Sequence, residues 1–172
     1  MDASRKGIRV RTIPLNHGLV ALVDDEDFLT LMAMGSWYAR KSRETHYASR
    51  GVRNAQGRWT TLNMHRVITG YPLVDHINGD GLDNRRANLR AATATQNNQN
   101  RRPSLSRSGF KGVTKSSKSN GWYARIRVNG KLIHLGCYPD PTSAARAYDA
   151  AALEHFGEFA WPNFRNEEVV SA

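Results

Sequence analysis

Residues 74–98 read VDHINGDGLDNRRANLRAATATQNN, and this stretch predicts a hairpin followed directly by a helix. The short β-branched run that opens it should end as a strand at Gly79, because glycine favours turns. Residues 89–92 can form the returning strand. Thr93 then precedes Gln96 by three positions, which is the capping-box arrangement at the start of a helix. We therefore expect one compact unit here.

Four polar side chains of this unit have the chemistry to cut a phosphodiester, namely Asp75, His76, Asn88 and Asn97. His76, with an ordinary pKa of about 6.5, can take a proton from water near neutral pH. The Asp75 carboxylate and the Asn97 amide oxygen could share a hard cation that stabilises the extra negative charge. Oxygen ligands point to Mg²⁺, with Mn²⁺ as a substitute, rather than to zinc.

The same residues resemble a known motif. Asp75-His76, then Asn-Arg-x-x-Asn88-Leu-Arg, then Asn97 is similar to the HNH nucleases, in particular the phage-type HNH homing endonucleases whose last motif residue is Asn. The resemblance implies that His76 is the general base and that Asp75 and Asn97 are metal ligands. It makes Asn88, the second candidate catalytic residue, the one that ties the loop to the strand.

The resemblance covers roughly the first hundred residues, including GLVALVDDED at 18–27 and MHR at 64–66. We therefore expect an HNH nuclease domain at residues 1–100, with its ββα-metal core at about 73–100. Taken singly, each motif residue has a plainer explanation as a turn or solvated helix residue. The runner-up site residue is His65, for which a structural histidine is as good an explanation as a phosphate contact.

Composition favours a nucleic-acid partner. The chain has a formal net charge of +10 and a pI of about 10.3, and residues 84–139 contain no Asp or Glu. Such a one-signed stretch attracts phosphates, although a solvated basic face is the alternative. The single Cys137 argues against disulfides and cysteine-bound zinc and favours a reducing, cytoplasmic location. We recognise no signal peptide or membrane span and expect no membrane partner.

Residues 101–108 are expected to form a basic linker, because Pro103 and its serine neighbours should interrupt regular structure. Arg101 and Arg102 would keep this linker against phosphates. Earlier in the chain, residues 40–59 are expected to form strands whose arginines could extend the DNA surface. A solvated sheet edge explains those arginines equally well.

The second half changes to a strand pattern. Residues 122–128 alternate as WYARIRV, Asn129-Gly130 is a strong hairpin signal, and residues 131–138 return. The predicted two-residue turn gives a register that has a buried and a cationic face. The expected buried pairs are Ile126 with Ile133 and Ala124 with Leu135, and the expected outward pairs are Arg127 with Leu132 and Arg125 with His134.

A helix should follow, capped by Asp140, opened by Pro141 and stopped at Gly157, with small residues along one side. The sequences WYARIR at 122–127 and AARAYDAAA at 144–152 resemble the plant ethylene-response-factor (Apetala-type) DNA-binding domain.

In that family the sheet lies in the major groove. The resemblance implies base contacts for Arg125 and Arg127 and phosphate contacts for Lys111 and Lys115, and we add His134 from the same face. A solvated strand face is the alternative for both arginines. We expect this domain at residues 109–165 and a disordered tail at 166–172.

The fold class expected is α+β, with the nuclease domain followed by a three-stranded antiparallel sheet and one helix. The function expected is that of a site-directed, homing-type DNA endonuclease acting on double-stranded DNA. A monomer without an obligate protein partner would carry one active site and should nick one strand. Two alternatives stay open: a non-catalytic DNA-binding regulator, and an RNA-cleaving or toxin-type nuclease. The resemblance leans towards a phage origin.

Overall fold

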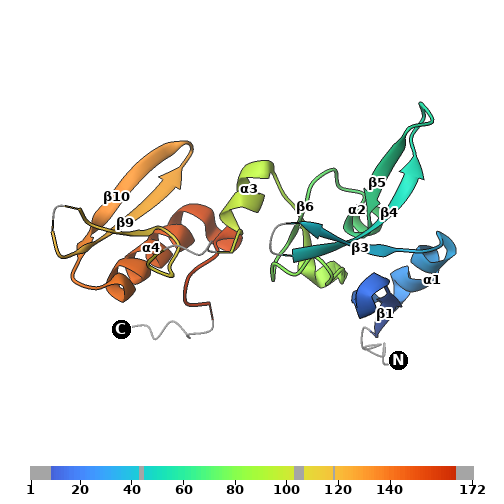
Figure 1. Cartoon of the computed structure of the whole chain (residues 1–172), viewed down its shortest axis with the longest axis horizontal. Coiled ribbons are helices and arrows are strands. Elements are labelled where there is room, and N and C mark those ends of the chain that lie inside the picture. Colours follow the sequence, from blue (N-terminus) through green and yellow to red (C-terminus); the bar gives the residue numbers. More distant parts are fainter. Residues whose placement is uncertain (1–8, 43–44, 103–106, 118, 166–172) are drawn as a thin grey trace, which may run out of the picture. The chain divides into compact units, whose positions relative to one another are not determined.

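The computed structural model describes residues 9–42, 45–102, 107–117 and 119–165, in two compact units, Met1–Ala94 and Thr95–Ala172 (Figure 1). Mixed helices and small antiparallel sheets make up both units. The domain limits expected at residues 100 and 109 stay predictions. The tail expected to be disordered and Pro103 of the linker lie outside the described residues. No helix in the described part is long and apolar enough to cross a bilayer.

The first unit is built from short elements. Its strands and helices are β1 (Val10–Pro14), β2 (Val20–Asp24), α1 (Asp25–Ala33), β3 (Tyr38–Ser42), β4 (Thr45–Arg53), β5 (Trp59–Asn63), α2 (Met64–Thr69), β6 (Val74–His76) and β7 (Leu89–Ala91). β1 and β2 form a hairpin, β3, β4 and β5 form a sheet with β4 in the centre, and β6 pairs with β7. Short 3-10 turns occupy Asn16–Gly18 and Arg86–Asn88.

One apolar cluster holds these elements together. Val23 of β2, Leu31 of α1 and Met64 of α2 are completely or almost completely buried in it, with Val74 and Leu89 from the motif hairpin at its border. Burial of the apolar side chains of Val74 and Leu89 thereby anchors the two strands that flank the motif loop. The expected hairpin is confirmed, with β7 covering three of the four residues predicted for the returning strand.

The first hairpin also supports the loop between β6 and β7 through the backbone. Leu22 N donates to Leu82 O at 2.9 Å, and Asn84 N donates to Leu22 O at 2.8 Å. Leu22 and Asp83 form an isolated parallel bridge at the same place. Backbone bonds from β2 therefore fix the far end of the motif loop, which apolar packing alone would leave free to move.

The second unit contains α3 (Ala94–Gln99), β8 (Val113–Lys115), β9 (Trp122–Val128), β10 (Lys131–Tyr138), α4 (Pro141–Phe156) and a 3-10 turn at Gly157–Phe159. β9 is the central strand of the antiparallel sheet β10-β9-β8. Asp140 caps α4 as predicted, because its side chain accepts from Ser143 N at 2.8 Å. The small residues of α4, with Ala144, Ala145 and Ala152 fully buried, let the helix lie close to the sheet.

The predicted hairpin register is correct only near the turn. Ile126 pairs with Ile133 and Arg125 with His134, but Ala124 pairs with Gly136 and not with Leu135. A β-bulge between His134 and Gly136 takes up the extra residue, and Gly136 has a φ of +142° that other residues rarely adopt. The expected burial of Ile133 is also wrong, since it lies 36% exposed on an edge strand.

A second set of polar bonds closes this unit. The buried Asp149 carboxylate of α4 accepts from the backbone N–H groups of Asn163 and Phe164 at 2.8 and 3.0 Å. Asn163 in turn bonds both backbone groups of Lys111. These bonds join the segment after α4 to the segment before β8. The Asn163-Phe164 pair therefore has a structural role in this unit, although it follows all three strands in the sequence.

Gly112 lies in the loop before β8, where this loop packs against Tyr148 of α4. Its φ is +76°, and a Cβ there would overlap the ring of Tyr148. Gly130 has a similar φ of +80°, but nothing lies within 4 Å of a Cβ at that position. The two glycines therefore separate the effect of backbone strain from the effect of a steric overlap.

We predict that Gly112→Ala lowers the free energy of unfolding by about 3 kcal/mol, from strain plus overpacking. Gly130→Ala is the matched control and should cost about 1 kcal/mol, from strain alone. Urea denaturation of the full chain measures both. Equal losses in the two variants would contradict the close packing of Tyr148 on Gly112.

Candidate functional site

Asp75 sits in β6 opposite Arg90 of β7, and the two side chains form a buried ion pair. Arg90 Nε and Nη2 both donate to Asp75 Oδ2, at 2.9 and 2.7 Å, and the side chains of Arg90 and Asp75 are only 12% and 8% exposed. A carboxylate so buried needs a counter-charge. Sequence reasoning did not identify Arg90, although its cross-strand position could have been read from the hairpin register.

His76 is buried next to Asp75, and two aromatic rings surround it. Its ring centroid lies 5.0 Å from that of His65 and 5.6 Å from that of Tyr47. Burial lowers the pKa of His76 below its ordinary value, and the bond to Asn84 and the neighbouring carboxylates only partly oppose this effect. His76 is therefore neutral at pH 7, the state in which an imidazole can accept a proton.

Asn84 is a fully buried residue that sequence reasoning missed as part of the site. Its Nδ2 donates to Leu82 O at 3.1 Å, so its Oδ1 is the atom that faces His76 Nε2, at 3.5 Å. An amide oxygen only accepts hydrogen bonds. This arrangement favours the imidazole proton on Nε2 and the basic character on Nδ1. The signal in the sequence was the first Asn of the Asn-Arg-x-x-Asn run.

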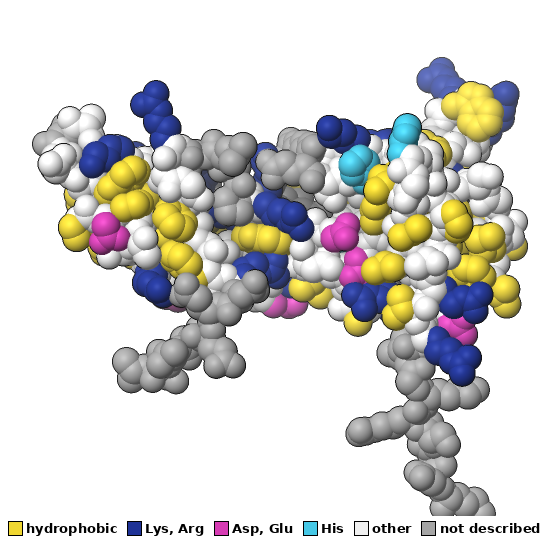
Figure 2. Space-filling view, turned by 60° about the horizontal axis from the view of Figure 1, so that its bottom comes forward, with side chains coloured by type: hydrophobic (Ala, Val, Ile, Leu, Met, Phe, Trp, Pro, Cys, Tyr) yellow, Lys and Arg dark blue, Asp and Glu magenta, His cyan; other side chains and the backbone are white. Residues whose placement is uncertain are grey.

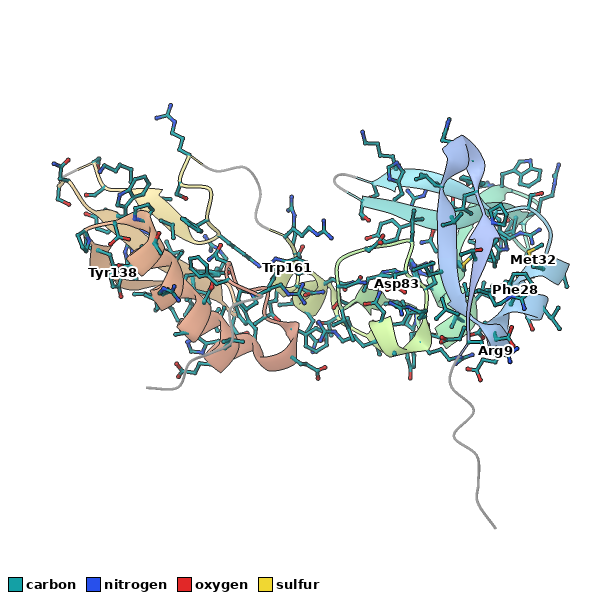
Figure 3. The ribbon with its side chains drawn as sticks, turned by 90° about the horizontal axis from the view of Figure 1, so that it is seen from below. Arg9, Phe28, Met32, Asp83, Tyr138 and Trp161 are labelled. Atoms are coloured by element: carbon teal, nitrogen blue, oxygen red, sulfur yellow. The ribbon has the colours of Figure 1, made fainter. Side chains whose placement is uncertain are left out.

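Asn88 holds the loop between β6 and β7 closed. Its Nδ2 donates to Asp83 O at 2.8 Å and to Asn78 Oδ1 at 3.0 Å, and its Oδ1 accepts from Asn78 N at 2.9 Å. Asp83, labelled in Figure 3, accepts from Arg85 at 2.7 Å and from Asn78 Nδ2 at 2.8 Å. The bond to Arg85 lowers the pKa of Asp83. These residues bind one another within the loop.

Asn97, the expected second metal ligand, lies on α3 and therefore in the second unit. Asp75 and His76 lie in the first unit. Three of the four motif residues, Asp75, His76 and Asn88, thus belong to one structural unit, and the pairing of Asn97 with Asp75 stays a prediction. α3 begins at Ala94, directly after the Thr93 that the capping-box pattern singled out.

His65, the runner-up, belongs to the same ring cluster as His76. It lies on α2 and is 6% exposed, and its Nδ1 has no hydrogen-bond partner among the described residues. Burial, followed by the neighbouring His76, Arg66 and Arg40, lowers the pKa of His65 to about 3. His65 is therefore uncharged at pH 7, which makes it a poor electrostatic partner for a phosphate.

The donor set around Asp75 fits a hard divalent cation. Mg²⁺ is usually held by one or two carboxylates together with substrate phosphates and waters, without a cage of protein ligands. Asp75 supplies one carboxylate whose direction Arg90 fixes. In the described part of the chain, no cluster of three or more His, Cys, Asp or Glu side chains could hold a metal.

The candidate DNA-binding residues of the second unit divide into two groups. Arg125 and Arg127 stand on the sheet face opposite the buried Ala124 and Ile126, with His134 beside Arg125. The Arg125 guanidinium lies 4.8 Å from the Tyr123 ring centroid, and Arg127 Nη1 donates to Gly130 O at 2.8 Å. This group forms an outward cationic face.

The second group interacts mainly with the protein itself. Lys111 Nζ donates to Gln99 O at 2.7 Å and to Arg101 O at 2.9 Å, and burial lowers the pKa of Lys111 to about 8. Lys115 Nζ donates to Asn120 O at 3.0 Å and lies 4.9 Å from the Trp122 ring centroid. Arg101 is exposed, whereas the Arg102 guanidinium lies 5.5 Å from the Trp161 ring centroid.

Comparisons with known proteins agree with the motif and with the second unit. Residues 73–99 match the HNH endonuclease family. A protein of Acanthamoeba polyphaga mimivirus, described as an uncharacterized HNH endonuclease, is 40% identical over 103 residues, which are 60% of this chain and 53% of that protein. An AP2/ERF and B3 domain-containing protein of rice (Oryza sativa subsp. japonica) is 41% identical over 66 residues, 38% of this chain and 18% of the plant protein.

An AP2-like ethylene-responsive transcription factor of Arabidopsis thaliana is 46% identical over 59 residues, which are 33% of this chain and 17% of that protein. This chain therefore spans about half of the viral relative and less than a fifth of either plant relative. No solved structure matches it. The chain is thus related to the HNH endonucleases through the motif at residues 73–99, and its C-terminal region is similar to AP2/ERF proteins.

Proposed function

We propose that this protein is a metal-dependent endonuclease that cuts double-stranded DNA at an HNH centre and holds its substrate with the C-terminal sheet. The observation that carries the proposal is the pair of adjacent buried residues, the neutral His76 and the Arg90-bound Asp75, within the HNH motif. The general base is already neutral, and the carboxylate that would bind the metal is already oriented, before the substrate binds. Such preorganisation is the main contribution a protein makes to phosphodiester cleavage.

In the proposed reaction His76 acts as the general base. Its Nδ1 would take a proton from the attacking water, while Asn84 keeps the other ring nitrogen protonated. Asp75 and Asn97 would hold the divalent cation, proposed to be Mg²⁺ with Mn²⁺ as a substitute, whose charge stabilises the nonbridging and leaving oxygens. Asn88 keeps the loop closed around this centre.

Recognition is assigned to the second unit. Arg125 and Arg127 stand on the central strand β9, and the other face of this strand packs on α4. Linking this face to the nuclease unit would raise the local concentration of the cleavage site. We propose a homing-type enzyme that works as a monomer and nicks one strand, because one chain carries one HNH motif.

A DNA-binding regulator without catalysis is the second candidate. It is favoured by the outward cationic face and by the similarity of the C-terminal region to a plant transcription factor. The two candidates differ in whether the chain breaks DNA, so a cleavage assay separates them.

We predict that His76→Ala lowers the rate of nicking of supercoiled plasmid in Mg²⁺ by about a hundredfold or more, because a general base is lost. Asp75→Asn should do the same without leaving Arg90 beside an empty space, as Asp75→Ala would. His155→Ala, in the exposed end of α4, is the matched control and should nick like the parent. Undiminished nicking by both motif variants would refute cleavage at this centre, and a parent chain that does not nick DNA would leave the regulator.

We predict that Arg125→Ala and Arg127→Ala each weaken binding at the preferred site by about 1–3 kcal/mol, while binding to unrelated DNA changes little. Lys131→Ala removes the same charge from the exposed end of the same hairpin, where Lys131 pairs with Val128 on the other face. Its effect should be small at both kinds of site. Mobility-shift titrations against both DNAs give the comparison, and equal losses in all three variants would contradict readout by this face.

The lowered pKa of the buried His65 leads to a prediction about stability. The folded-state pKa of His65, about 3, lies below its ordinary value, so protonation favours the unfolded chain. Above about pH 6.5 His65 is neutral in both the folded and the unfolded chain, and its protonation does not lower the free energy of unfolding. As the pH falls from there towards 3, protonation of His65 in the unfolded chain lowers the free energy of unfolding by about 1.4 kcal/mol per pH unit.

Between pH 7 and pH 5 we therefore expect the free energy of unfolding of His65→Phe to fall by about 2 kcal/mol less than that of the parent. The matched control is His155→Ala, which replaces an exposed histidine of α4. Urea denaturation at the two pH values is the measurement. An identical slope in parent and His65→Phe would mean that His65 titrates normally in the folded chain.

A further inference from the structure

The hairpin formed by β4 and β5 carries a row of side chains that the proposed mechanism does not use. Arg53 pairs with Trp59, Gly51 with Thr61, and Ser49 with Asn63. Because alternate residues of a strand share a face, Tyr47 stands on the same side as this row. We call the face defined by Tyr47, Ser49, Gly51, Arg53 and Trp59 the hairpin strip.

At its outer end the strip presents a tryptophan to solvent. Trp59 is 70% exposed, its ring lies 3.5 Å from where a Cβ of Gly51 would be, and the Arg53 guanidinium is 5.0 Å from its ring centroid. Arg53 Nη1 also donates to Gly57 O at 3.0 Å, so the arginine and the indole are held side by side. A large aromatic side chain held open to water beside a fixed cation has the composition of a binding hot spot.

The charge around this tryptophan has one sign. Residues 45–74 contain no Asp or Glu, and Arg53 and the exposed Arg58 form no ion pair among the described residues. The hairpin projects from the body of the first unit (Figure 1), and hydrophobic and basic side chains gather at its outer end (Figure 2). An uncompensated cationic tip of this kind is attracted to phosphates.

The strip is continuous with the candidate catalytic centre. Tyr47, at its inner end, has its ring centroid 5.6 Å from those of His65 and His76. The strand from Tyr47 to Arg53 rises by about 3.4 Å at each residue and therefore spans about 20 Å. At roughly 3.4 Å per step of duplex, this length corresponds to about six base pairs.

We propose that the tip of the hairpin strip is a second DNA contact, in which Arg53 and Arg58 bind phosphates and the Trp59 indole packs on the sugar and base edges. The contact lies about six base pairs from the cleaved bond. This proposal rests on the proposed nuclease function. It adds a contact by which the nuclease unit itself binds duplex DNA of any sequence, independently of Arg125 and Arg127.

The test measures binding separately from cleavage. A fluorescein-labelled duplex of arbitrary sequence is titrated with the full chain carrying His76→Ala, in Mg²⁺, and anisotropy is recorded over a range of salt concentrations. Into this background are placed Trp59→Ala, Trp59→Phe and Arg53→Ala. The matched controls are Leu29→Ala, which removes another exposed apolar side chain of the same unit, and Arg9→Ala, which removes another exposed arginine.

We expect Trp59→Ala to weaken binding about tenfold without changing the salt dependence, and Trp59→Phe to weaken it less. Arg53→Ala should weaken binding and lower the slope of log K against log salt by about one unit, because one phosphate contact is lost. Both controls should stay within twofold of the background chain. On a second duplex that carries the preferred site, hydroxyl-radical footprinting of the Trp59→Ala and Arg53→Ala chains should show lost protection near the hairpin contact and retained protection at the cleaved bond.

Two outcomes overturn the proposal in distinguishable ways. If the His76→Ala chain binds the duplex but Trp59→Ala and Arg53→Ala behave like Leu29→Ala and Arg9→Ala, the hairpin contact is wrong and the nuclease proposal stands. A protein partner for Trp59 would give this same result. If the His76→Ala chain and the parent both fail to bind any duplex, both proposals fail together.

Discussion

The candidate centre depends on the buried ion pair between Asp75 and Arg90. Such a pair adds little net stability, because the desolvation of both charges offsets most of their attraction. Its effect is on register: a slip of one residue between β6 and β7 would leave two charges buried without partners and turn every side chain to the opposite face. Since His76 is the next residue of β6, the same constraint directs the imidazole into the ring cluster with His65 and Tyr47.

Local sequence patterns predicted the elements well. The motif hairpin, the caps of α4 and the hairpin register next to Asn129-Gly130 follow from turn and capping preferences that act over a few residues. The bulge at Leu135 was not predicted. A glycine such as Gly136 can adopt an unusual backbone conformation, but this does not indicate at which neighbouring residue the register shifts. Burial of Ile133 was predicted only from the alternation of apolar and polar residues. Alternation does not indicate how far α4 extends over the sheet.

The site was predicted less completely, because its contacts are long-range. Asp75, His76 and Asn88 were identified from their spacing, and the structure brings them into one unit. Tyr47 and His65 come from β4 and α2, and nothing in their own sequence neighbourhoods indicates that they meet His76. Lys111 was assigned to phosphates by resemblance, yet its ammonium binds the carbonyls at the end of α3, which only tertiary structure could reveal.

The bulge in β10 has a consequence for how the protein behaves in solution. β10 is an edge strand, and Leu132 and Ile133 stand exposed on it, so a flat, regular strand here would offer a template for pairing with another molecule. The irregularity at Gly136 increases the local twist and breaks the row of evenly spaced backbone groups. We expect this irregularity to make edge-to-edge pairing of two β10 strands less favourable and to leave the proposed DNA-binding face accessible.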